Sequence, residues 1–179
     1  MPDNLETFMQ GMTAAAFLFN RAVEKRSALE CLVLQANIID GCLRIGLILK
    51  QQLDTCNAAV DQSLLRQKDE DPRISERDIF QRALNSGVID GALHRTLSEA
   101  YEKRNKCIHR YLLCSIDYDY VAKLVFELDH LLDQVRDQIS RLEQEQICRG
   151  VGMTVEGSET TKEQLRDFAL RKERPYNLG

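Results

Sequence analysis

The sequence predicts an all-α protein folded as an antiparallel bundle of about five helices. Apolar residues recur at spacings of three and four along almost the whole chain, and no segment alternates apolar and polar residues as a strand does. Only three of the 179 residues are prolines, and apolar residues make up 44% of the chain. A single domain of this size can therefore bury a sizeable core.

The first two predicted helices follow each other closely. The first covers residues 4–25, and Ser27 is placed to cap the second, at about 28–55. The second helix has an apolar stripe broad enough to be buried on two sides. The inner face of the first is Leu5, Phe8, Met12, Ala15, Phe19 and Val23, and that of the second is Leu32, Ala36, Ile38, Ile39, Cys42, Leu43, Ile45, Leu47 and Leu53.

A polar run at about 57–73 breaks this periodicity and predicts a loop, or a short helix followed by a linker. Ser75 and Asp78 then resemble a capping box for a short helix that Gly87 ends. Asp90 is placed to cap the next helix, at about 91–113. The expected inner residues are Ile79, Phe80, Ala83 and Leu84 in the short helix, and Leu93, Leu97, Tyr101, Ile108 and Leu112 in the longer one.

The last long helix is predicted at about 118–146. Its apolar residues alternate at spacings of four and three, which predicts a seam that packs along another long helix. The seam consists of Val121, Val125, Leu128, Leu132, Val135, Ile139 and Leu142. We expect one bundle domain at 1–148 with a polar insertion at about 57–74. Residues 149–179 are expected to form a linker and a short helix that Thr160 and Glu163 can start, bearing Leu165, Phe168 and Ala169.

Composition narrows the classes of function. The net charge is only −4, so the whole surface is no general binder of polyanions. No apolar run approaches the roughly 20 residues that span a bilayer, and the start resembles no secretory signal, so we expect a cytoplasmic protein without membrane contact. The six cysteines form no C-x-x-C pair and are expected to be reduced core residues. We expect neither a metal nor a cofactor, because no glycine-rich phosphate loop and no H-E-x-x-H pattern occurs.

The stretch "RNKCIHRY", Arg104 to Tyr111, is the most unusual part of the sequence. Between Tyr101 and Arg110 four bases face one acid, a balance of +3, whereas residues 115–146 hold eight acids and three bases, a balance of −5. Histidine suits proton transfer near neutral pH, and arginine offers donors matched to phosphate oxygens. Together they suit metal-free cleavage of RNA. The alternative is the solvated basic face of a helix.

Helix geometry constrains such a site. At about 100° per residue, Arg104 and His109 point about 140° apart, whereas Asn105 and His109 share a face. Arg104 and His109 meet only if the helix breaks near His109, if Arg104 bends around it, or if a two-fold copy supplies the complementary group.

The stretch fits Arg-(four residues)-His-x-Tyr and resembles the signature of HEPN domains (higher eukaryotes and prokaryotes nucleotide-binding), in particular the HepT-like toxins. The flanking "IFQRALNSGVIDGALHRTLSEAYEKRNKCIHRYLLCSIDYDYVAKLV" has a similar order of a short helix, a Gly-Val-Ile turn, the motif helix, an Asp/Tyr-rich turn and a long helix. The resemblance covers about 28–146. It implies a homodimer formed through the motif helices and a metal-independent endoribonuclease, the toxin of a pair with an MNT-type nucleotidyltransferase antitoxin.

The resemblance also implies roles for individual residues. Arg104 is expected to bind or stabilise the scissile phosphate, His109 to act as general base or acid, and Asn105 to orient them or the RNA substrate. Tyr111 matches the tyrosine to which the antitoxin transfers AMP. The basic neighbours are expected to bind RNA; they are Lys103, Lys106 and Arg110. The alternative function is a non-catalytic module for helical dimerisation, nucleotide binding or scaffolding.

Overall fold

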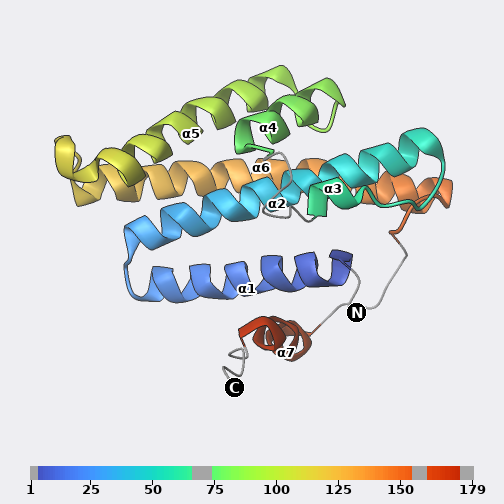
Figure 1. The fold of residues 1–179 in the computed structure, drawn as a ribbon, viewed down its shortest axis with the longest axis horizontal. Helices are drawn as coiled ribbons and strands as arrows, with labels where there is room; N and C mark the ends of the chain where they lie inside the picture. Colours follow the sequence, from blue (N-terminus) through green and yellow to red (C-terminus); the bar gives the residue numbers. More distant parts are fainter. Residues whose placement is uncertain (1–3, 66–73, 155–160, 174–179) are drawn as a thin grey trace.

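The computed structural model describes residues 4–65, 74–154 and 161–173, and every regular element within these ranges is a helix. The predicted all-α class is confirmed (Figure 1). The long helices are α1 (Asn4–Glu24), α2 (Ala28–Thr55), α5 (Gly91–Arg110) and α6 (Tyr118–Arg149). The shorter ones are α3 (Gln62–Leu65), α4 (Glu76–Asn85), the 3-10 helix η1 (Tyr111–Leu113) and α7 (Lys162–Glu173).

Helices α2 and α6 form the centre of the fold, with α1 on one side of this pair and α4 and α5 on the other (Figure 1). The central helices run in the same direction, because Gln35 bonds to Asp129 near their starts and Gln52 bonds to Gln146 near their ends. Helices α1 and α5 run in the opposite direction (Figure 1). The predicted antiparallel arrangement is therefore wrong for the central pair. Helix α5 carries the chain back to the end where α2 begins, so α6 starts beside the start of α2.

The core confirms the two long apolar stripes. On α2, Leu32, Ile39 and Leu43 are buried, and Ile38 and Leu53 widen the buried surface as expected. Helix α2 contacts α1, α6, α4 and α5, which explains why its stripe is so broad. On α6 the buried part of the predicted seam is Val121, Leu128, Leu132, Val135 and Ile139, while Val125 and Leu142 are partly buried against the core. The long partner of this seam is α2.

Local capping decides where several helices begin. Ser75 and Asp78 form the predicted capping box, with each side chain accepting from the other residue's backbone N–H. The Asp90 carboxylate accepts from Leu93 N at 2.8 Å and caps α5. Gly87 ends α4 with a φ of 76°. The prediction for Ser27 is wrong in part, because this residue precedes α2 but its side chain makes no capping hydrogen bond.

Three predicted inner residues lie elsewhere. Val23 is half-exposed near the end of α1, where Ala14 and Ala22 are the buried residues. Leu112 is 94% exposed, because the α-helix ends at Arg110 and a 3-10 turn at 111–113 redirects the chain. Ile108 is only partly buried, and Cys107 beside it is fully buried instead. For Leu112 the end of the α-helix explains the difference, whereas in α1 and α5 the neighbouring residues Ala22 and Cys107 occupy the inner face.

The polar insertion and the tail are described in part. Residues 66–73 lie outside the described residues, and α3 before them anchors the segment through the buried Leu64. Helix α6 ends at Arg149, Gly150 after it has the left-handed conformation, and α7 packs against α1. The box that starts α7 joins Thr161 and Gln164, one residue later than predicted. Phe168 is partly buried and Leu165 exposed, whereas Thr160 and the side chain of Ala169 lie outside the described residues.

Helix α2 corrects one expectation from the sequence. Its length and mean hydropathy reach the values at which a helix can cross a membrane, although no such run was expected. Within this helix 67% of the apolar window is buried inside the protein. Packing on several sides accounts for its apolar composition, as in the central helix of a helical bundle. The cytoplasmic location stays a prediction.

Candidate functional site

The candidate residues lie on the second half of α5 and on η1. Helix α5 continues without a break through Arg104 and His109 to Arg110, and Tyr111 starts the 3-10 turn. Cys107 is buried between them and fixes which face of the helix points inward. The motif residues are therefore distributed around a helix whose inner face is occupied by the core.

Arg104 is tied into the fold. Its guanidinium forms an ion pair with Glu76 from the first turn of α4, and its side chain is only 13% exposed. Its Nη1 donates to Asn105 Oδ1 at 2.9 Å, and its Cζ lies 4.8 Å from the centre of the Tyr101 ring. Its Nε is buried and makes no hydrogen bond with a described residue. Arg104 therefore faces α4 and Tyr101.

His109 lies apart from Arg104. It is exposed, and no hydrogen bond or ion pair joins its side chain to the described part of the chain. The helix does not break before His109, and Arg104 turns to Glu76 instead of bending around the helix. Arg104 and His109 therefore do not meet within the described chain, and their meeting across a second copy of the chain stays a prediction.

The predicted basic patch is partly neutralised. Lys103 Nζ donates to both carboxylate oxygens of Glu127 on α6, at 2.8 and 2.9 Å. This hydrogen bond raises the pKa of the Lys103 ammonium. Lys106 and Arg110 are exposed, and no ion pair joins them to a described residue. Lys106 and Arg110 are therefore the two of these three cations without a countercharge, and the binding role of all three stays a prediction.

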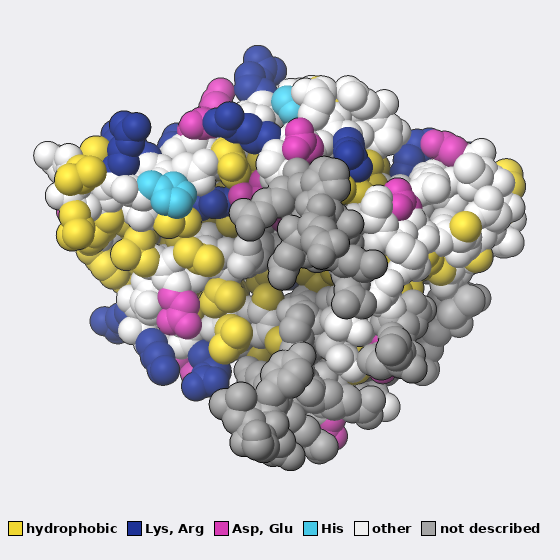
Figure 2. Space-filling model, viewed as in Figure 1, with side chains coloured by type: hydrophobic (Ala, Val, Ile, Leu, Met, Phe, Trp, Pro, Cys, Tyr) yellow, Lys and Arg dark blue, Asp and Glu magenta, His cyan; other side chains and the backbone are white. Residues whose placement is uncertain are grey.

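Tyr111 and the turn that follows form the end of the candidate site. Tyr111 is partly buried and packs against the core, whereas Leu112 and Leu113 are 94% and 83% exposed. Figure 2 shows apolar side chains gathered at the end of the molecule where η1 lies. Two neighbouring leucines therefore project into water beside the basic end of α5.

Sequence reasoning missed two members of the Arg104 cluster. Tyr101 lies three residues before Arg104, a helical spacing that could have identified it. Glu76 lies 28 residues away on another helix, and no pattern in the sequence links it to Arg104. Among the residues that the structure describes, no three His, Cys, Asp or Glu side chains gather in a way that could hold a metal ion.

Comparisons with protein-family models, curated proteins and solved structures gave no match. The class that the fold defines is an all-helical bundle.

Proposed function

We propose that the protein is a metal-independent endoribonuclease of HEPN type. The observation that carries the proposal is the placement of Arg104, Asn105, His109 and Tyr111 along one helix end, with the His109 ring open to solvent and next to two unpaired cations. An accessible imidazole beside Lys106 and Arg110 is an arrangement that can meet a phosphodiester of RNA.

The chemistry is a transfer within the RNA strand. A base removes the proton of the 2′-hydroxyl, its oxygen attacks the adjacent phosphorus, and the bond from phosphorus to the 5′-oxygen breaks. The departing 5′-oxygen takes up a proton, so the products are a 2′,3′-cyclic phosphate and a 5′-hydroxyl. His109 serves as base or acid, and Arg104 stabilises charge on the phosphate oxygens. Asn105 orients Arg104, to which it is hydrogen-bonded.

The proposal requires two copies of the chain. Arg104 and His109 do not meet within one chain, so a two-fold dimer through the α5 helices would have to bring the two motifs to one cleft. The exposed Leu112 and Leu113 support an interface at this end, because burying them removes large apolar side chains from water.

We extend the proposal to a toxin whose partner is a nucleotidyltransferase antitoxin. AMP transferred from ATP to the Tyr111 hydroxyl, with release of pyrophosphate, would add a bulky anion at the end of the motif helix and repel the RNA backbone. Because Tyr111 is partly buried in the 3-10 turn, the turn would have to present the hydroxyl to the antitoxin.

The test is RNA cleavage in the presence of EDTA, with analysis of the product ends. His109→Ala is expected to abolish cleavage and keep the fold, as followed by circular dichroism. His130→Ala is the matched control, because His130 is an exposed histidine on α6 that does not belong to the motif. Undiminished cleavage by His109→Ala, or an equal loss of cleavage in His109→Ala and His130→Ala, would contradict the proposal.

A second function, a non-catalytic dimerisation or scaffold module, is favoured by the contacts of Arg104. Its guanidinium is already bound by Glu76 and covered by Tyr101, as in a residue retained for structure. This alternative predicts no RNA turnover by the wild-type protein and loss of partner binding when residues 150–179 are removed. Retained partner binding after this removal would count against a role of the tail.

A further inference from the structure

A groove lies between α1, α2 and α6, away from the motif helix. Its volume is about 360 Å³, within the range of small-molecule sites. None of the residues that line it belongs to α4, α5 or η1. The groove is therefore independent of the proposed nuclease site, and what it binds can be tested separately.

The middle of the groove is apolar. Phe19 and Val23 from α1 face Val125 and Phe126 from α6 across it. Phe126 is 75% exposed and Val23 is 51% exposed, which is unusual for large apolar side chains on opposite walls of one groove. A ligand with an apolar body would remove both from water, and this burial favours binding.

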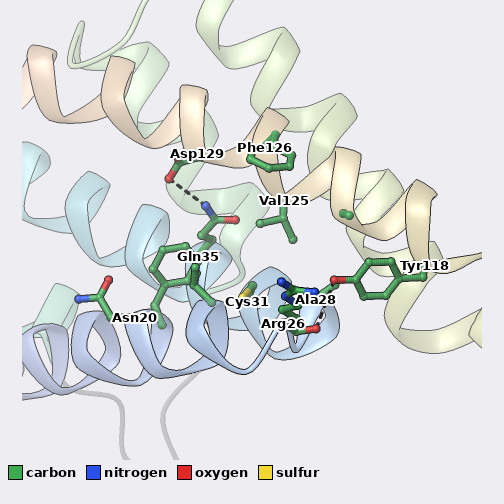
Figure 3. Close-up of a pocket in the computed structure, with 12 residues that line it drawn as sticks. Asn20, Arg26, Ala28, Cys31, Gln35, Tyr118, Val125, Phe126 and Asp129 are labelled. Carbon is green, nitrogen blue, oxygen red and sulfur yellow. Dashed lines mark hydrogen bonds between the residues drawn. The ribbon is translucent and has the colours of Figure 1, made fainter.

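One part of the groove presents a hydrogen-bond acceptor without a partner. Gln35 is fully buried, and its Nε2 donates to Asp129 Oδ1 at 3.1 Å. Because a carboxylate only accepts, this bond fixes the orientation of the amide. The Oε1 atom is left without a hydrogen bond to any described residue, and Figure 3 shows it turned from Asp129 toward Val125. A donor on a ligand would satisfy this oxygen.

Another part of the groove is cationic. Arg26, in the turn between α1 and α2, lines the groove beside Tyr118, and no ion pair joins it to a described residue (Figure 3). Its φ of 55° is the left-handed conformation that favours glycine at the end of a helix. An arginine held there at a conformational cost is explained if its side chain has a use.

We propose that this groove binds a small amphipathic organic anion. Its apolar body lies between Val23 and Phe126, its carboxylate or sulfonate pairs with Arg26, and an N–H or O–H group donates to Gln35 Oε1. The apolar walls, the buried unpaired acceptor and the arginine each match one part of such a molecule.

The test uses 2-anilinonaphthalene-6-sulfonate, in which an N–H donor joins the phenyl ring to the naphthalene and a sulfonate lies at the far end of the naphthalene. Fluorescence titration of the full chain is expected to saturate at one site. Arg26→Gly is expected to weaken binding about tenfold or more. The same variant is expected to keep or raise the melting temperature, because glycine suits a positive φ. Loss of binding would then not result from loss of fold.

Two controls separate the parts of the proposal. Arg26→Lys keeps the charge and should weaken binding less than Arg26→Gly does. Arg95→Ala, at an exposed position outside the groove, should bind the dye as the wild type does. The N-methyl analogue of the dye lacks the N–H donor, so the wild type should bind it more weakly than the dye itself. The Gln35→Met variant should bind the dye and its N-methyl analogue with equal affinity. Fluorescence that never saturates, or that Arg26→Gly leaves unchanged, would overturn the proposal.

Discussion

Glu76 and Arg104, which lie 28 residues apart in the sequence, form an ion pair between the first turn of α4 and the second half of α5. Both side chains are largely withdrawn from water, and Tyr101 covers the guanidinium. Any phosphate that binds Arg104 therefore competes with a carboxylate of the same chain. The pair also holds α4 against the motif helix, so its two partners contribute to stability as well as to the candidate site.

The first prediction concerns this pair. Glu76→Gln is expected to lower the free energy of unfolding by about 1–2 kcal/mol, because it leaves a poorly solvated guanidinium without its countercharge. Glu102→Gln is the matched control, since it breaks an ion pair with Arg77 in which both side chains are well exposed. Its expected cost is below about 0.5 kcal/mol. Urea denaturation measures the loss of unfolding free energy in each variant. Equal losses would show that burial does not strengthen the ion pair between Glu76 and Arg104.

The capping box at the start of α4 leads to a prediction about pH. Hydrogen bonds from the Ser75 side chain and backbone hold the pKa of Asp78 below its ordinary value of 3.8. The folded protein thus favours the carboxylate. The stabilisation is present above the pKa of the unfolded chain and is lost as the pH falls through the lower pKa of the folded state.

Asp78→Ala removes this contribution. The difference in unfolding free energy between the wild type and Asp78→Ala is expected to be constant near neutral pH and to shrink as the pH falls below 3.8. Urea denaturation at a series of pH values measures it. A difference that stays the same into strong acid would contradict a stabilising carboxylate at Asp78.

Much of the fold could be predicted because its determinants are local or periodic. Short-range patterns in the sequence determine the apolar stripes of α2 and α6, and they also determine the caps at Ser75 and Asp90. The direction of α6 relative to α2 was not predictable in this way. It depends on how the intervening helices return the chain, and the buried Gln52 and Gln146 bond to each other across 94 residues.

In the candidate site, too, local features could be predicted from the sequence, whereas contacts between helices could not. That Arg104 and His109 diverge follows from helix geometry alone and needed no structure. That Arg104 is paired with Glu76 and Lys103 with Glu127 depends on packing between helices, so the sequence overstated the free positive charge. Leu112 is exposed because of the 3-10 turn, which no pattern in the sequence predicted.

A third prediction concerns the contact between α2 and the turn that joins α4 to α5. A Cβ at Gly46 would lie 2.8 Å from Val88 Cγ1, and Val88 is a stiff buried side chain. Gly46→Ala is therefore expected to destabilise the fold by about 1–2 kcal/mol, since the clash outweighs the gain in helix propensity. Gly91→Ala is the control, because nothing lies within 4 Å of its Cβ, and its stability should be unchanged or raised. A Gly46→Ala protein as stable as the wild type would show that Val88 shifts freely.

The last prediction tests which cations of the motif helix meet RNA. Lys103 and Lys106 lie three residues apart on α5, but Glu127 binds only Lys103. The charges of Lys106 and Arg110 are not balanced within the described chain, so each can pair with a phosphate. Each phosphate contact adds about 0.7 to the slope of log affinity against log salt for a single strand.

Binding of a single-stranded RNA to the His109→Ala protein, followed by fluorescence anisotropy, avoids cleavage during the measurement. Adding Lys106→Ala or Arg110→Ala should lower affinity and reduce the slope by about 0.7 each. Adding Lys103→Ala should leave the slope unchanged, because its charge is already balanced within the chain. An equal effect of Lys103→Ala and Lys106→Ala would mean that RNA displaces Glu127 and that the whole basic face takes part.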